Sequence, residues 1–147
     1  MDPLRVAELE RRLGYRFRDP QLLEQALTHA SYANEHPPAA DHSRLAFVGD
    51  AALALVVADR VMADDPAAPV GVLTSQRAEL VTGPRLARWA SELELGPLLR
   101  LGRGEDQSGG RTRDSILAAA LEAVLGAIYS EGGLDALRDT VGRLAAW

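Results

Sequence analysis

The feature that most constrains the fold of this chain is an apolar repeat in its C-terminal third. Between residues 116 and 129, apolar side chains recur at i, i+1, i+4, i+5, i+8, i+9, i+12 and i+13, and they are Ile116, Leu117, Ala120, Leu121, Val124, Leu125, Ile128 and Tyr129. This spacing places all of them on one face of an α-helix. Gly132 and Gly133 are expected to end that helix, and a last helix is predicted from Leu134 to about Ala146.

Helical signals also dominate the rest of the chain. The pairs Asp2-Pro3 and Asp19-Pro20 each combine an N-cap residue with proline at the first helical position, and Gly14 is expected to end the first helix. A helix is predicted from about Ser43 to Met62, and because it is apolar on nearly all sides we expect it to be central. Shorter helices are predicted over residues 72–81 and 84–93, and loops over residues 32–41, 64–71 and 101–113. Since no convincing strand is present, we predict an all-α fold of about six or seven helices in a single domain, residues 1–147.

Composition narrows the class of protein. The chain has no cysteine, its 16 basic residues are all arginine, and its formal net charge is −5. Without cysteine it has no disulfide, no thiolate metal site and no cysteine nucleophile. The N-terminal residues lack the apolar core of a signal peptide, and the longest low-charge apolar run, Ala51 to Ala58, is too short to span a bilayer. We therefore expect a soluble, cytoplasmic protein without membrane association, whose acidic balance opposes non-specific nucleic-acid binding but allows a local basic site.

Two isolated acids and one arginine-rich segment are candidates for chemistry. Asp50 and Glu122 each lie inside an apolar helix, where a carboxylate needs a salt bridge, a wet groove or a metal ion. If the two helices cross, these acids could converge on a divalent metal through oxygen ligands. The segment 103–113 is rich in glycine and arginine, so it either contacts phosphate or is a flexible surface loop. The three histidines, His29, His36 and His42, have no spacing typical of a metal site.

Several motifs resemble the endonuclease domain of the ribonuclease III family. Residues 29–35, His-Ala-Ser-Tyr-Ala-Asn-Glu, match the family pattern His-x-Ser-Tyr-x-Asn-Glu. Residues 44–53, Arg-Leu-Ala-Phe-Val-Gly-Asp-Ala-Ala-Leu, resemble the pattern Asn-Glu-Arg-Leu-Glu-Phe-Leu-Gly-Asp that follows it in the family. Further similar segments occur in the family's order at residues 14–17, 101–105, 109–111, 115–118 and 122–129. The resemblance therefore covers essentially the whole chain.

This resemblance implies a function and a partner. It implies an all-helical domain that dimerises and carries one carboxylate cluster per subunit along a valley for double-stranded RNA. In the family, a Mg²⁺-activated water attacks a phosphodiester, and the metal stabilises the developing charge. The family cluster has four acids, one pair at i, i+4 on the signature helix and one pair at i, i+3 on a later helix. These spacings place each pair on one helical face.

The chain departs from the family at the acids themselves. On the signature helix the first acid position is Ala46 and the second is Asp50, whereas on the later helix they are Ala119 and Glu122. Ser43 also replaces the family glutamate before Arg44-Leu45. Asp50 and Glu122 are thus interpreted as remnants of a catalytic metal site. Because alanine cannot be a ligand and Mg²⁺ demands near-octahedral geometry, Mg²⁺ binding is predicted to be weakened or lost, with Mn²⁺ as a possible substitute.

The family resemblance also implies roles for three further residues. The resemblance implies that Phe47 inserts into the partner subunit and that Arg111 and Arg113 contact RNA phosphate. Typical bacterial members have a double-stranded RNA-binding domain after this one, and this sequence shows none. Without that module, non-specific RNA affinity is expected to be weak.

Three interpretations of function remain open at this point. The leading one is a catalytically impaired or inactive domain that acts as an RNA-binding or structural dimer, either with itself or with an active homologue. The first alternative is an active Mg²⁺-dependent double-stranded RNA endonuclease for RNA processing, in which Glu35 or Asp41 supplements Asp50 and Glu122. The second alternative is a helical protein-interaction module that does not bind RNA.

Overall fold

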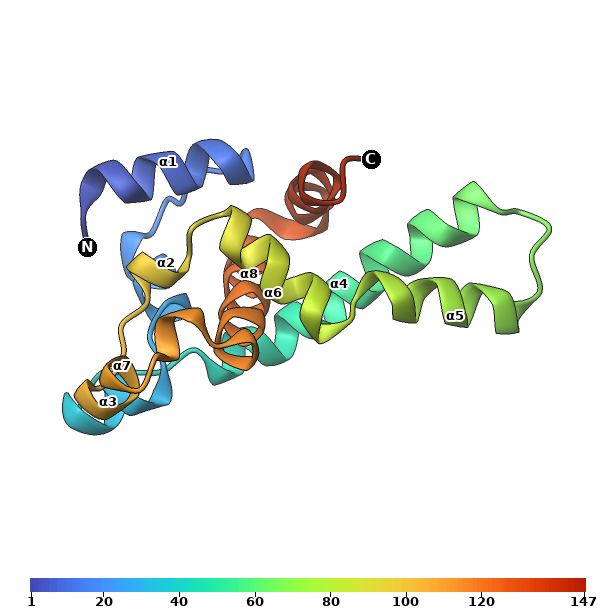
Figure 1. Ribbon diagram of the computed structural model, residues 1–147. Coiled ribbons are helices and arrows are strands. Elements are labelled where there is room, and N and C mark those ends of the chain that lie inside the picture. The colour runs from blue at the N-terminus through green and yellow to red at the C-terminus, as the bar shows by residue number, and fades with distance from the viewer.

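The computed structural model describes residues 1–147 and consists of helices joined by short connections (Figure 1). Its elements are α1 (Pro3–Leu13), α2 (Pro20–Ala26), α3 (Ala30–Glu35), α4 (Ser43–Asp64), α5 (Val70–Leu80), α6 (Gly83–Glu92), η1 (Gly96–Leu98), α7 (Arg103–Gln107), η2 (Gly110–Thr112) and α8 (Asp114–Leu144). The only β-type pairing is an isolated bridge between Thr28 and Arg100. The predicted all-α class is confirmed, although there are eight α-helices rather than six or seven.

The predicted helix starts are confirmed by their capping contacts. The Asp2 carboxylate accepts a hydrogen bond from the backbone nitrogen of Leu4 at 2.9 Å. The Asp19 carboxylate does the same for Gln21 at 3.0 Å. Gly14 adopts φ 67°, a left-handed conformation that a glycine reaches without strain, and it ends α1 where the sequence predicted.

The core is built around α8, which packs against α4 on one side and α6 on another (Figure 1). The largest fully buried side chains include Leu53 of α4, Trp89 of α6, and Leu121, Leu125 and Ile128 of α8. Each of these contributes about 1.5–3 kcal/mol of hydrophobic stabilisation when buried. The apolar face predicted for residues 116–129 is therefore the main contact surface of the fold.

By length and composition alone, α8 is apolar enough to cross a membrane. However, 61% of its most apolar window is already buried inside the protein, as expected for a core helix. Gly133 interrupts the helix with φ 82° and ψ −177°, so the segment is two helices joined at a kink. The predicted break at Gly132-Gly133 and the new helix after it are confirmed.

The helices α4 and α5 form a hairpin that projects from the body of the protein (Figure 1). Helix α5 has no buried residue, and α4 is buried along one face only. The prediction that α4 is central is thus only half right, because its other face exposes Phe47, Leu55 and Met62. A single chain has no element that covers this face.

Two predicted loops contain helices. Residues 30–35 form α3, which begins because the Nδ1 atom of His29 accepts a hydrogen bond from the Ser31 backbone nitrogen at 3.1 Å. The segment 101–113 contains α7 and η2, and Gly110 within it is buried. The loop predictions failed because contacts from distant parts of the chain order both segments.

Candidate functional site

The candidate site lies where α4 crosses α8, and two glycines bring the two backbones into contact. A Cβ atom added to Gly49 would lie 1.8 Å from the carbonyl oxygen of Glu122. A Cβ atom added to Gly126 would lie 2.0 Å from the carbonyl oxygen of Leu45. Neither position can carry a side chain without separating the helices. This close crossing positions the residue after Gly49, which is Asp50, beside Glu122.

Asp50 and Glu122 form a carboxyl pair across this crossing. Glu122 is half-buried, and Asp50 is exposed at the surface. Burial is the largest effect on Glu122, and together with the nearby Asp50 charge and a hydrogen bond between the two carboxyl groups it raises the pKa of Glu122 to about 7. Near neutral pH Glu122 is therefore only partly ionised, and its protonated form can donate a hydrogen bond to the Asp50 carboxyl group. The two carboxyl groups thus lie close together, whereas their role as remnants of a metal site stays a prediction.

The two alanines lie on the same helical faces as the acids. Ala46 precedes Asp50 by one turn of α4, and Ala119 precedes Glu122 by one turn of α8; both alanines are half-buried. No group of three or more histidine, cysteine, aspartate or glutamate side chains in the chain could hold a metal ion. Two carboxylates supply too few ligands for Mg²⁺, which requires near-octahedral oxygen coordination. The residues present do not make a complete site for the family's metal.

The two proposed substitute ligands, Glu35 and Asp41, make other contacts, and their role as metal ligands stays a prediction. Both carboxylate oxygens of Glu35 accept from the backbone nitrogen of Arg103 at 3.1 Å, at the start of α7. The Asp41 carboxylate accepts from the backbone nitrogen of Ser43 at 2.8 Å, at the start of α4. Both acids cap helices and neither joins Asp50 and Glu122 in a metal-binding group.

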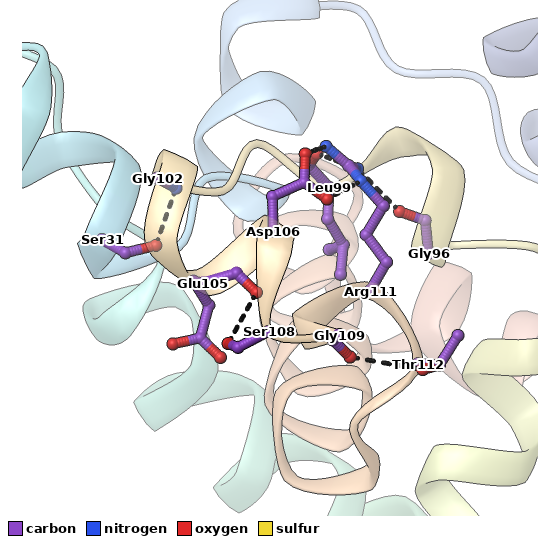
Figure 2. Close-up of polar contacts among 10 residues, drawn as sticks. All are labelled: Ser31, Gly96, Leu99, Gly102, Glu105, Asp106, Ser108, Gly109, Arg111 and Thr112. Atoms are coloured by element: carbon purple, nitrogen blue, oxygen red, sulfur yellow. Dashed lines mark hydrogen bonds and ion pairs between the residues drawn. The ribbon is translucent and has the colours of Figure 1, made fainter.

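Arg111 is bound within the protein by nearly all of its guanidinium donors (Figure 2). It donates to the carbonyl oxygens of Gly96 at 3.0 Å and Leu99 at 2.6 Å, and its other nitrogens bind the Asp106 carboxylate at 2.9 and 3.2 Å. Arg111 therefore ties η1 to α7. Its predicted contact with RNA stays a prediction, but it would have to be made by a side chain that is already engaged.

Arg113, at the start of α8, is also paired. Its guanidinium forms an ion pair with Glu105 and donates to the carbonyl oxygen of Ser108 at 3.0 Å. Phosphate would have to compete with Glu105 for this cation. The arginine of the segment whose side chain forms no ion pair or hydrogen bond is Arg103, which is exposed.

Phe47 is 82% exposed, so it is not an ordinary core aromatic. It begins a stripe along α4 that continues through Ala51, Leu55 and Met62, all exposed. These positions follow at i, i+4, i+8 and i+15, which lie on one face of a helix. An uncovered apolar stripe of this length is typical of an interaction surface. The predicted insertion of Phe47 into a partner stays a prediction.

The structure also reveals why the motif at residues 29–35 has its composition. The Ser31 hydroxyl accepts from the backbone nitrogen of Gly102 at 2.8 Å (Figure 2), and Glu35, one turn later, caps α7. The His29 ring lies 5.8 Å from that of His42, whose Nδ1 atom is buried without a hydrogen-bond partner. The motif thus joins α3, α4 and α7. The spacing of His29 and His42, 13 positions apart, does not indicate that the two rings meet.

An all-helical domain with a carboxyl pair at the crossing of its two core helices is consistent with the family that the motifs resemble. A family model described as Ribonuclease-III-like matches residues 19–146. The chain therefore belongs to the ribonuclease III family.

Similar proteins and structures agree with this assignment. Ribonuclease 3 of Oleidesulfovibrio alaskensis is 51% identical over 130 residues, which are 88% of this chain and 57% of that protein. Ribonuclease 3 of Symbiobacterium thermophilum is 50% identical over 136 residues, 92% of this chain and 57% of that protein. The nuclease domain of ribonuclease III from Campylobacter jejuni superposes with a TM-score of 0.89 at 36% identity, covering 98% of this chain and 94% of that domain. The chain spans less than two thirds of the length of the curated relatives it matches.

Proposed function

We propose that this chain is a dimeric, ribonuclease III-type domain that binds double-stranded RNA but is impaired in cleaving it. The observation that carries this proposal is the pair Asp50 and Glu122, which stands alone where the family resemblance implies four acids, with Ala46 and Ala119 in place of the others. Because the pKa of Glu122 is raised to about 7, this carboxyl group is only partly ionised near neutral pH. Such a pair attracts a divalent cation weakly, because protons and metal compete for the same oxygens.

The impairment follows from what phosphodiester hydrolysis requires. In the family, the divalent metal, when bound, supplies the activated water and stabilises charge on the phosphoryl oxygens. Catalysis of this kind depends on positioning and electrostatics, and a displacement of about 1 Å costs about a hundredfold in rate. Asp50 and Glu122 could still attract a cation, but they have no third side chain with which to fix its position.

An active Mg²⁺- or Mn²⁺-dependent endonuclease for RNA processing is the second candidate. Two observations favour it, namely the convergence of Asp50 and Glu122 and the identity of up to 51% with proteins named Ribonuclease 3. In this case substrate oxygens and water would complete the coordination of the metal. The same experiment distinguishes the two candidates.

Dimerisation is supported by the exposed stripe on α4 that begins at Phe47. A related nuclease domain of Campylobacter jejuni, at a TM-score of 0.88 and 37% identity, has a region described as involved in dimer formation. We propose a homodimer through this stripe; a heterodimer with an active homologue would use the same surface. The helical interaction module without RNA binding and the cytoplasmic location stay predictions from the sequence.

The test is to rebuild the missing acids. Long double-stranded RNA is incubated with Mg²⁺ or Mn²⁺ and either the unmodified chain or the double variant Ala46→Glu, Ala119→Asp. A matched control places the same acids on two exposed alanines outside the site, Ala7→Glu with Ala67→Asp. Cleavage by the rebuilt variant alone is expected, and robust cleavage by the unmodified chain would establish the second candidate instead. Binding of uncut RNA, measured in EDTA at stated salt, separates the RNA-binding dimer from the interaction module.

A further inference from the structure

A column of three planar groups stands beside α3, at the end of the molecule opposite the α4–α5 hairpin (Figure 1). The guanidinium carbon of Arg100 lies 4.2 Å from the centre of the Tyr32 ring. The rings of Tyr32 and His36 are parallel to within 12°, with centres 4.0 Å apart. Two groups this close cannot share one face of the same ring, so Arg100 and His36 lie on opposite faces of Tyr32. The order of the column is therefore Arg100, Tyr32, His36.

Both ends of the column are fixed by polar contacts. The Arg100 guanidinium forms an ion pair with Glu24, and its backbone nitrogen donates to the carbonyl oxygen of Leu27 at 2.8 Å. At the other end, Nδ1 of His36 is 3.0 Å from the carbonyl oxygen of Tyr32, so this nitrogen carries the proton and donates. The outer imidazole is thus held in place before any ligand arrives, which lowers the entropic cost of binding to it.

The outer end of the column faces solvent. His36 is exposed, and neither a further aromatic ring nor a guanidinium stacks on it. The residue before it, Glu35, binds the backbone nitrogen of Arg103 through its carboxylate, which places the first residue of α7 against the end of α3. The Arg103 side chain is exposed and has no ionic partner. A flat, fixed heteroaromatic face and an unpaired cation therefore lie at the meeting point of two neighbouring elements, α3 and α7.

We propose that His36 is a stacking platform for an unpaired RNA base and that Arg103 contacts the neighbouring phosphate. This inference rests on the RNA binding proposed above and adds a feature of the substrate, a base outside the duplex. Unpaired bases stack on aromatic and histidine side chains, whereas paired bases within a duplex are not available to do so. A guanidinium beside the ring matches the phosphate that connects such a base to the strand. The combination favours RNA over a protein partner, which would require an apolar surface here.

The test compares two RNA probes in EDTA, so that no cleavage occurs. One is a blunt duplex, and the other is the same duplex extended by one unpaired 2-aminopurine, whose fluorescence falls when it stacks. The variants are His36→Ala, His36→Phe as the rescue, Arg103→Gln, and Asn34→Ala as the control, an exposed residue of the same helix. Dissociation constants and fluorescence are measured over a range of salt concentrations.

The unmodified chain, His36→Phe and Asn34→Ala are expected to quench the fluorescence, whereas His36→Ala is not. His36→Ala should weaken binding of the extended duplex about tenfold and leave the blunt duplex unchanged. Arg103→Gln should reduce the salt dependence of binding to the extended duplex by about one phosphate contact. Quenching that persists in His36→Ala, or equal binding of both probes by every variant, would overturn this inference and leave the proposed function intact. Failure of the unmodified chain to bind either probe would overturn both.

Discussion

The Glu122 carboxyl group meets that of Asp50 because Gly49 and Gly126 let α4 and α8 touch through their backbones. The same contact that orders the core also buries Glu122 and raises its pKa to about 7. The crossing of α4 and α8 therefore affects both the stability of the protein and the pKa of Glu122. The two effects can be tested separately.

The first prediction concerns the pH dependence of the pair. The folded pKa of Glu122 is about 7, above the ordinary value of 4.5, so between these values the folded state binds more protons than the unfolded state. Its contribution to stability is present below about pH 4.5 and is lost as the pH rises through 7. Glu122→Gln removes this loss and should be more stable than the unmodified chain at about pH 8. Because Glu122 is only half-buried, we expect a difference of about 1 kcal/mol, measured by urea denaturation.

The control for this effect is the same comparison at about pH 4, below the ordinary pKa of 4.5, where Glu122 is largely uncharged in both the folded and the unfolded state. The difference between them should nearly vanish there. A Glu122→Gln advantage that is the same at both pH values would mean that the ionisation of Glu122 carries no stability cost.

The second prediction concerns the helix crossing. Gly126→Ala places a methyl group against the backbone of Leu45, which cannot rotate away. We expect a loss of about 3 kcal/mol in the free energy of unfolding, as for overpacking of a tight core. Gly142→Ala is the matched control, since it lies in the same helical segment and its Cβ would meet no heavy atom within 4 Å. That control should gain up to about 1 kcal/mol from helix propensity, and equal effects of the two substitutions would contradict the close crossing.

The third prediction concerns acid sensitivity at the start of α4. Burial is the largest effect on both His42 and His29, and it lowers the pKa of each. The neighbouring His29 lowers the pKa of His42 further, whereas the Asp41 charge acts to raise the pKa of both histidines. Arg113 further lowers the pKa of His29. Both folded values lie below 6.5, so the unfolded state binds more protons and stability falls as the pH drops below about 6.5. Protonation of His42 would also create a buried N–H group at a position where the chain offers no partner.

Thermal denaturation between about pH 5 and 8 tests this effect, which has the opposite sign to that of Glu122. His42→Asn should flatten the acid side of the profile, whereas His36→Asn, at an exposed position, should leave it unchanged. If the unmodified chain and His42→Asn lose thermal stability identically as the pH falls, protonation of His42 is not the cause of the acid sensitivity.

The fourth prediction separates structural from RNA-binding arginines. Arg111→Lys loses the planar fork that binds two carbonyl oxygens and the Asp106 carboxylate at once, and one ammonium group cannot replace it. The expected cost is about 2 kcal/mol in stability. Arg77→Lys, on exposed α5 and without an ion pair, is the matched control and should have no effect. If Arg111→Lys retained full stability but lowered the salt dependence of RNA binding, the family-derived role of Arg111 would be correct instead.

Local signals in the sequence accounted for most of the helices. Asp2, Asp19, Gly14 and Gly133 act through contacts within a few residues, so their effects could be predicted without knowledge of the fold. In contrast, α7 is ordered by Ser31, which lies 71 residues before its partner Gly102. No local pattern indicates such a contact, and the glycines and charges of this segment alone suggest a loop.

The candidate site also has features that the sequence predicts and features that only the structure shows. Helical periodicity and the family pattern were sufficient to predict that Asp50 and Glu122 converge, because each lies on a strongly apolar helix. The raised pKa of Glu122 was not predictable, since it depends on how closely Gly49 and Gly126 let the helices approach. The contact of the Glu35 carboxylate with the start of α7 was not predictable either, since its partner Arg103 lies 68 residues further along the chain.

The last prediction concerns Phe47, whose side chain is 82% exposed in the single chain. If it is buried in a symmetric dimer, Phe47→Ala removes two rings from one interface, which we expect to cost about 3 kcal/mol and to raise the dimer dissociation constant about a hundredfold. Light scattering over a concentration series measures this shift. Leu4→Ala is the matched control, because Leu4 is also 82% exposed but lies on α1, away from the α4 stripe. Since neither side chain is buried within the subunit, both variants should stay folded, and a dimer equally stable in both would assign the interface to another surface.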